Sequence, residues 1–91
     1  MESIISSKRQ CFICGATNNL HCHHIFPGSS RRKRSEMRGF KVYLCHVHHG
    51  ECHKHINSGA SLYLKRLCQA YYEANYGTRE EFISEFGKSR L

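Results

Sequence analysis

Hydrophobic residues in the last third of the chain recur at helical spacing. The positions i, i+3, i+4 and i+7 are occupied by Leu64, Leu67, Cys68 and Tyr71. This periodicity predicts one apolar face of an amphipathic helix, and Gly77 is suited to end that helix as its C-cap. Both observations favour packing rather than chemistry for this segment.

A second, shorter helix is predicted after Gly77. Thr78 is followed three residues later by Glu81, which is the pattern of a capping box. The apolar positions behind this start are Phe82, Ile83 and Phe86, and Gly87 ends the pattern. Residues 61–91 are therefore predicted to form a helical tail of two helices.

The first part of the chain, about residues 7–57, is rich in Cys, His and basic residues. Two short β-prone segments lie at 21–25 and 41–44, separated by the long polar connection 27–39. The connection contains Gly28, two serines and four consecutive cations at 31–34, and we expect an exposed basic loop there. The pattern predicts an α+β fold.

Length and charge narrow the class of protein. The 91 residues are enough for one small domain, spanning 1–91, with its core at about 11–57. Fourteen Lys and Arg oppose seven Glu and no Asp, which gives a formal charge of +7, and residues 1–61 carry +6 of it. The predicted partner is therefore anionic.

Six Cys and eight His point to a metal-stapled fold. The start of the chain lacks the apolar run of a secretory signal, and no stretch is apolar enough for a transmembrane helix, so a cytoplasmic protein without a membrane partner is expected. In a reducing compartment, Cys spacings favour metal sites over disulfides. A domain this small needs such support because its hydrophobic core supplies only a few kcal/mol.

Four residues have the spacing of a structural zinc site. Cys11 and Cys14 form a CxxC followed by Gly15, and Cys45 and His48 repeat the two-residue gap thirty residues later. Cys52 competes with His48 for the fourth place, and unligated buried thiols are the alternative to a zinc site. Cys22 and Cys68 are interpreted as small core residues.

The remaining histidines fall into two sets near the proposed zinc ligands. His23 and His24 are adjacent at the end of a predicted strand, while His49, His53 and His55 follow the second ligand pair. A zinc ion that joins the two ligand pairs would also bring these two sets together. The clustering therefore favours a second, functional group of histidines.

In order and spacing, the sequence resembles the HNH nucleases of the ββα-metal (His-Me finger) superfamily, in particular the short HNH proteins of phages and prophages. The matching segments read CFICGATNNLHCHHIFPGS, the basic connection, and VYLCHVHHG. Further matches are R-x-x-S-E-x-x-G from Arg32 to Gly39, the segment 55–57, Leu64-Lys65 and Phe86-Gly87. The resemblance covers about residues 11–91 and is most specific in the Cys/His part.

The resemblance implies a zinc-stapled ββα-metal finger with assigned site residues. Cys11, Cys14, Cys45 and His48 would hold the structural Zn²⁺, with His48 where Cys is usual. His24 would be the general base, while His23 and His49, with His55 as a further ligand, would hold one catalytic divalent ion. At the place of the family's central Asn this chain has Phe40, so a backbone carbonyl near Gly39 to Lys41 is expected to accept the Nδ1 proton of His24.

The function implied is metal-dependent hydrolysis of DNA phosphodiester bonds, nicking or double-strand cutting with low sequence specificity. Imidazole ligands and the absence of Asp favour Mn²⁺, Ni²⁺ or Zn²⁺ over Mg²⁺ as the catalytic ion. Phosphate contacts are assigned to Arg31, Arg32, Lys33, Arg34, Arg38 and Lys41. Phage packaging or replication proteins are the expected protein partners.

Two other functions fit the sequence. A non-catalytic zinc-finger module would bind DNA with the same fold, although it would need no spare base beside a second metal site. A His-rich metal-storage or sensor protein would need no DNA affinity. For the basic run itself, the alternatives are a solvated loop or a localisation signal.

Overall fold

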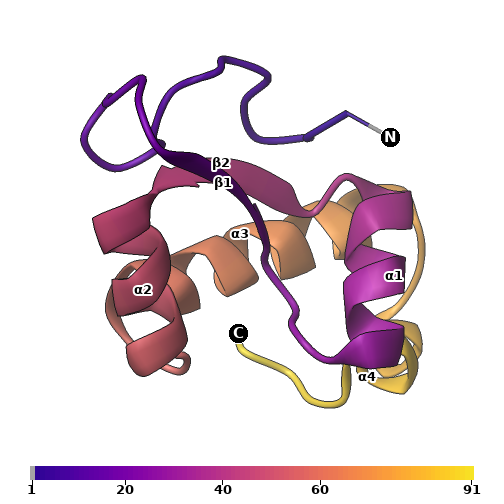
Figure 1. Cartoon of the computed structure of the whole chain (residues 1–91). Helices are drawn as coiled ribbons and strands as arrows, with labels where there is room; N and C mark the ends of the chain where they lie inside the picture. The colour runs from indigo at the N-terminus through magenta and orange to yellow at the C-terminus, as the bar shows by residue number, and fades with distance from the viewer. Residues whose placement is uncertain (1) are drawn as a thin grey trace.

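The computed structural model describes residues 2–91 as a small α+β fold with a two-stranded sheet and four helices (Figure 1). The elements in chain order are β1 (Leu20–His24), α1 (Ser29–Arg38), β2 (Lys41–Cys45), α2 (His46–Lys54), α3 (Gly59–Asn75) and α4 (Arg79–Phe86). The predicted fold class is confirmed at this level.

The two strands pair antiparallel in one register, from Leu20 opposite Cys45 to His24 opposite Lys41. α2 begins directly after β2 and packs against both strands, so the strands and α2 together make a ββα unit. Figure 1 shows α3 running below the sheet, α2 at one end, and α1 with α4 at the other. This arrangement places the His-rich end of β1 beside α2.

The core that holds α1 and α4 to the sheet is aromatic. Phe26 and Phe40, on either side of α1, meet Phe82 and Phe86 of α4, and all four side chains are fully buried. The ring centroids of Phe26 and Phe86 lie 4.4 Å apart. Each such burial stabilises the fold by about 1.5–3 kcal/mol. Phe40 therefore serves packing, at the position where the resemblance would place a polar residue.

The prediction of an exposed loop at 27–39 is wrong, because most of it forms α1. This helix has almost no apolar face: Ser35 is buried, whereas Met37 is 72% exposed. The Ser35 hydroxyl accepts a hydrogen bond from the Phe26 backbone N–H at 3.1 Å. Gly39 ends the helix in the left-handed conformation, with φ of 72°. Hydrophobic periodicity could not reveal a helix that is held by polar contacts and a glycine cap.

The two tail helices are confirmed, but the buried face of α3 is rotated from its predicted position. The buried residues are Ser61, Leu64, Lys65, Cys68, Gln69 and Tyr72, whereas Leu67 and Tyr71 are only half-buried. Three polar residues thus share the inner face. In α4 the capping box of Thr78 and Glu81 is present, and Ile83 is 37% exposed.

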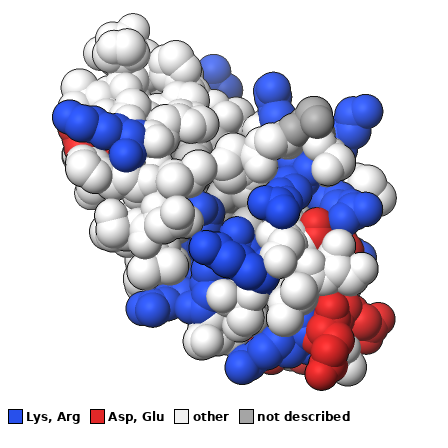
Figure 2. All heavy atoms as spheres, turned by 90° about the horizontal axis from the view of Figure 1, so that it is seen from below, with Lys and Arg blue, Asp and Glu red and all other residues white. Residues whose placement is uncertain are grey.

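Charge is unevenly spread over the surface. Figure 2 shows basic side chains across the face seen from below, and acidic side chains concentrated at one edge of that view. Figure 1 shows the C-terminal segment and the start of α1 on this side of the molecule. Within residues 2–91, no helix combines the length and apolar character that crossing a membrane requires.

Candidate metal centres

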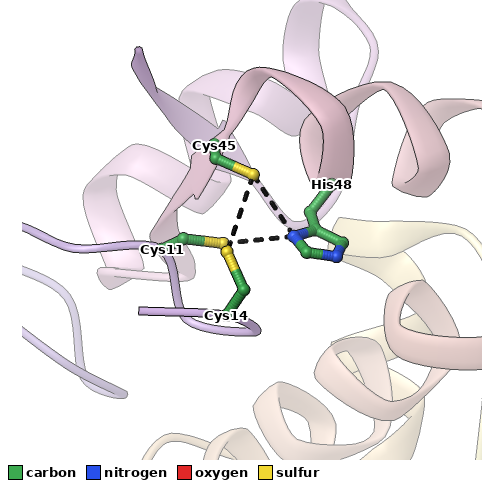
Figure 3. A group of neighbouring side chains, drawn as sticks. All are labelled: Cys11, Cys14, Cys45 and His48. Carbon is green, nitrogen blue, oxygen red and sulfur yellow. Dashed lines mark hydrogen bonds between the residues drawn. The ribbon is translucent and has the colours of Figure 1, made fainter. Parts of the chain in front are cut away.

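The first group of metal-ligating side chains joins three segments of the chain (Figure 3). Cys11 and Cys14 lie in the turn that precedes β1, Cys45 ends β2, and His48 lies in the first turn of α2. Their ligand atoms lie within 4.8 Å of one another. The structure therefore brings together the four residues that the sequence pairs by spacing, and this group could bind a metal ion.

The distances within this group fit a tetrahedral ion. Zn–S bonds near 2.3 Å and Zn–N bonds near 2.0 Å imply about 3.8 Å between two sulfurs and about 3.5 Å between sulfur and nitrogen. The observed values are 3.9 Å from Cys14 Sγ to Cys45 Sγ, and 3.5 Å and 3.2 Å from His48 Nδ1 to the sulfurs of Cys11 and Cys45.

The surroundings of Cys11 favour the ionised, thiolate form of its side chain. Burial opposes ionisation of this thiol, but backbone hydrogen bonds from Cys14 and Cys45 outweigh that effect and lower its pKa to about 6. Metal ions bind the thiolate form, so this environment favours a ligand. By contrast, burial raises the pKa of the Cys52 thiol, which lies outside the four-residue group.

Cys22 and Cys68 differ from each other. Cys68 is fully buried, as expected of a core residue, whereas Cys22 is exposed, so its assignment to the core is wrong. Cys22 lies on β1 between His21 and His23, so the alternation of the strand turns it to the face opposite these two histidines, whose rings both lie near His49.

The second group consists of three histidines: His23 of β1 with His49 and His53 of α2. His49 and His53 are four residues apart, so they lie one above the other on the same helix face, and their Nε2 atoms are 3.1 Å apart. The His23 ring meets both, with centroid distances of 5.4 Å to His49 and 5.6 Å to His53. This group could also bind a metal ion.

His23 is the least solvated member of this second group. Its side chain is 3% exposed, and among residues 2–91 neither ring nitrogen has a hydrogen-bond partner. Burial, together with the neighbouring His49 and His53, lowers its pKa to about 4. The imidazole is therefore neutral near pH 7, which is the form that binds a metal. Buried nitrogens without partners are expected where an ion completes the site.

His55 is not part of this second group, contrary to the prediction from the resemblance. It follows α2, is exposed, and lies 3.7 Å from Glu51 through its Nε2 atom. Six residues along a helix correspond to a rotation of about 240°. His53 therefore lies on the same face of the helix as His49, whereas His55 lies on a different side.

His24 lies beside the three histidines and is held by a carboxylate. Its Nε2 atom is 3.2 Å from Glu36 Oε1, and Glu36 also contacts Lys41. These hydrogen bonds, that of Lys41 first, lower the pKa of Glu36 to about 2. A carboxylate only accepts hydrogen bonds, so the contact assigns the proton to Nε2 and leaves Nδ1 as the acceptor. The sequence predicted that a backbone carbonyl would orient the His24 ring through Nδ1. Instead, the Glu36 carboxylate contacts the ring at Nε2.

A cavity of about 290 Å³ opens beside the second group. His24, His49 and His53 line it, together with Arg32 and the segment Pro27 to Gly28. A metal ion at the three histidines would face this space, which leaves room for a ligand other than protein. Closed tetrahedral sites are typical of structural zinc, whereas an open position is typical of catalytic metal.

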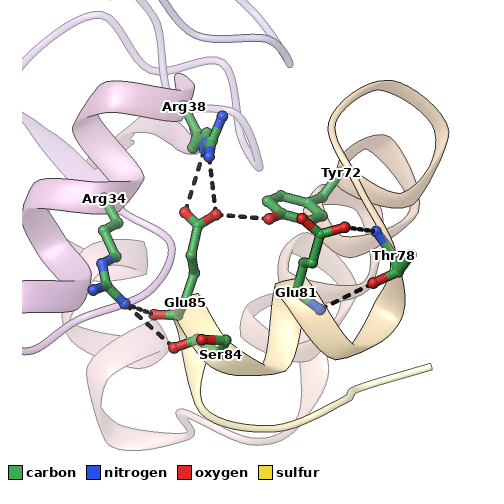
Figure 4. Close-up of polar contacts among 7 residues, drawn as sticks. All are labelled: Arg34, Arg38, Tyr72, Thr78, Glu81, Ser84 and Glu85. Atoms are coloured by element: carbon green, nitrogen blue, oxygen red, sulfur yellow. Dashed lines mark hydrogen bonds and ion pairs between the residues drawn. The ribbon is translucent and has the colours of Figure 1, made fainter.

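The six basic residues assigned to phosphate contacts have different surroundings. Arg32 and Lys33 are exposed near His24, and Arg31 lies further around α1. Two others connect α1 to α4 (Figure 4): Arg34 Nη1 donates to the backbone oxygen of Glu85 at 2.8 Å, and Arg38 binds the Glu85 carboxylate at 2.9 Å. These two arginines therefore hold the fold together.

Two residues at this site, His53 and Glu36, are assigned no role by the resemblance, although His53 belongs to the histidine cluster that the sequence reveals. His53 could have been found from its i+4 spacing to His49, which is a common arrangement of metal ligands on a helix. For Glu36 the only signal in the sequence was its place in the R-x-x-S-E pattern, because its proximity to His24 depends on α1.

Comparisons with protein-family models, curated proteins and solved structures find no match for this chain.

Proposed function

We propose that this protein is a metal-dependent endonuclease of the HNH type, which hydrolyses phosphodiester bonds of DNA. The observation that carries the proposal is the second group: His23, His49 and His53 form an open set of imidazole ligands, with His24 beside it on the same cavity. A structural module would need the first group only.

His24 is proposed as the general base. Its Nδ1 atom would take a proton from the attacking water, and the resulting imidazolium would be stabilised by the Glu36 carboxylate at Nε2. A base that is oriented by a second side chain on its other nitrogen is a recurrent arrangement in hydrolases. Glu36 is thus a positioning residue, and its pairing with Lys41 keeps it ionised.

The remaining requirement is stabilisation of negative charge at the phosphate. A divalent ion held by His23, His49 and His53 would supply Lewis-acid stabilisation of the scissile phosphate. Three imidazoles suit Mn²⁺, Ni²⁺ or Zn²⁺ better than Mg²⁺. Arg32, on the rim of the cavity, is placed to contact a phosphate of the bound strand.

The first group is proposed to hold Zn²⁺ as a structural ion. Its four donors are mutually close and come from the turn before β1, from β2 and from α2, so one ion would fix these segments to each other. Because α2 carries His49 and His53, zinc binding at the first group would also set the position of the second.

The test is conversion of supercoiled plasmid to nicked or linear DNA by zinc-loaded protein with Mn²⁺, Ni²⁺, Mg²⁺ or EDTA. Cleavage is expected with Mn²⁺ or Ni²⁺, with less in Mg²⁺ and none in EDTA. His24→Ala should lower the rate by about 100-fold or more, in the range of general-base contributions.

His46→Ala is the matched control, since it removes an exposed imidazole at the start of α2. It should cleave like the wild type. Cleavage by His24→Ala at the wild-type rate would refute the assigned base. DNA binding without cleavage under any metal would instead favour the non-catalytic zinc module, and absence of DNA binding would favour a metal-storage or sensor role.

A further inference from the structure

A second cavity shares the segment Pro27 to Gly28 with the cavity beside the histidines. It has a volume of about 330 Å³, and four cationic side chains line it. These are Arg31 of α1, Lys65 of α3, and Lys88 and Arg90 of the C-terminal segment. Among the residues that the structure describes, its lining contains no acidic side chain. Figure 2 shows the basic face to which the C-terminal segment and the start of α1 belong.

Lys65 is an unusual member of this cluster because it is buried. Its side chain is 2% exposed, and its Nζ atom donates to the backbone oxygen of Ile56 at 2.6 Å. Burial, followed by the charges of Arg90, Lys88 and Arg31, lowers its pKa to about 8. An ammonium group that is buried among three other cations costs stability unless an anion joins it.

Arg90 has a donor that the protein leaves unsatisfied. Its Nη1 atom donates to the backbone oxygens of Phe86 and Lys88, at 3.0 Å and 2.8 Å. The Nε atom is buried and has no hydrogen-bond partner in residues 2–91. Buried donors are nearly always paired, so this one indicates an acceptor supplied by a ligand.

The chain fixes these cations in place. Gln69 is fully buried in α3, and its side-chain oxygen accepts a hydrogen bond from the Arg90 backbone N–H at 2.7 Å, while its amide donates to Ser89. Arg31 lies against Gly87, where a Cβ atom would collide with the guanidinium and where φ is +97°. Gly87 therefore provides the space that lets Arg31 reach the C-terminal segment.

We propose that this cavity binds a backbone phosphate of the DNA strand, separate from the phosphate that is cleaved. The proposal rests on the proposed nuclease function for the identity of the strand. Both cavities are lined by Pro27 and Gly28. A strand that crosses this segment would present different phosphates to the histidines and to the four cations. The second contact would fix the strand in register with the His23 group.

The first arm of the test uses inorganic phosphate and needs no cleavage. Wild-type protein that holds one equivalent of zinc is titrated with phosphate while its backbone amide NMR signals are recorded. Shifts are expected at Gly28, Lys88 and Arg90. The double variant Arg31→Gln/Lys88→Gln should weaken phosphate binding at least tenfold. Both replaced side chains are exposed, so the fold should survive.

Lys8→Gln is the matched control for charge. Lys8 is exposed in the N-terminal segment, which Figure 1 shows on the opposite side of the molecule from the C-terminal segment. This variant should bind phosphate like the wild type. No shift in the wild type, or equal binding by the double variant and Lys8→Gln, would overturn the proposal even if the protein cleaves DNA.

The second arm uses a short DNA duplex in the His24→Ala background, so that the DNA stays intact. Each phosphate contact contributes about 0.9 to the slope of log affinity against log salt. The double variant should lower that slope by about 1 relative to Lys8→Gln. An unchanged slope, with phosphate binding intact in the first arm, would overturn the strand assignment and identify a site for free phosphate compounds. Failure of cleavage alone would refute the nuclease function and leave the first arm standing.

Discussion

The two groups of metal-ligating residues differ in whether they leave a coordination position open for a ligand from outside the protein. The Cys11 group supplies four donors of mixed sulfur and nitrogen, all within 4.8 Å of one another, which is the number of ligands in a closed tetrahedral site. The His23 group supplies three nitrogens on a cavity of about 290 Å³. Although both lie on the same ββα unit, the first has the donor set of the proposed structural ion and the second has the donor set and cavity of the proposed catalytic ion.

The largest effect that separates the groups is expected from Cys14→Ser. Cys14 is exposed, so its loss removes a ligand with little change in packing. Structural zinc contributes about 10 kcal/mol or more of binding free energy to folding, and loss of one ligand should lower the free energy of unfolding by at least about 3 kcal/mol. Urea denaturation of the zinc-loaded protein, followed by circular dichroism, measures this loss.

Cys22→Ser is the control for that variant, because Cys22 is also exposed but belongs to neither group. Its free energy of unfolding should stay within about 0.5 kcal/mol of the wild type, as for ordinary surface substitutions. If Cys14→Ser and Cys22→Ser unfold at the same urea concentration, the first group does not hold the fold together.

The second effect concerns activity with the fold intact. His53→Ala removes one of three ligands, and plasmid nicking should fall by at least about 100-fold, since loss even of a residue that only orients a ligand costs 10- to 100-fold. The unfolding midpoint should remain close to that of the wild type because His53 is exposed.

His55→Ala is the natural comparison, since it tests directly which histidine completes the site. It should nick plasmid at the wild-type rate, because His55 pairs with Glu51 away from the ligand face. A larger loss with His55→Ala than with His53→Ala would restore the ligand set that the resemblance implies.

The third effect is on stability at alkaline pH. Lys65 keeps its proton up to about pH 8 in the folded state and to about 10.5 when unfolded, so the unfolded state holds more protons between these values. Stability of the wild type should therefore rise with pH relative to Lys65→Met across this window, by about 2 kcal/mol. Paired urea titrations at pH 7 and pH 10, in buffer without phosphate, measure the difference. A constant difference would contradict the buried charge.

The smallest effect is expected at Glu36. Glu36→Gln keeps an oxygen that can accept from His24 Nε2 but removes the negative charge, so cleavage should fall about tenfold. Glu51→Gln, at an exposed acidic residue, should leave the rate unchanged. Cleavage by Glu36→Gln at the same rate as Glu51→Gln would mean that Glu36 does not position the base.

Residue spacing predicted those features of the fold and site that depend on residues close together in the sequence. The CxxC and CxxH pairs predicted the membership of the first group because a tetrahedral ion needs two pairs of donors at short range. The capping box of Thr78 and Glu81 and the two strands were likewise predictable from neighbouring residues. Each of these features depends on contacts within a few residues or on a single ion that joins two such segments.

Features that depend on tertiary structure were not predictable in the same way. α1 lacks an apolar stripe, so its contacts with α4 through Arg34 and Arg38 were hidden, and with them the approach of Glu36 to His24. The inner face of α3 carries Lys65 and Gln69, which a search for apolar residues excludes. Both polar residues face the C-terminal segment, whose position the pattern does not encode.

We propose that one ion holds the fold while another performs the chemistry. The most direct test of this proposal is the initial rate of plasmid nicking by protein that holds one equivalent of zinc, as Mn²⁺ is added. We expect folded protein without activity before the addition, and a rate that rises to saturation with Mn²⁺ in the wild type but not in His53→Ala. Full activity with one zinc ion and no response to Mn²⁺ would contradict the division between the two groups.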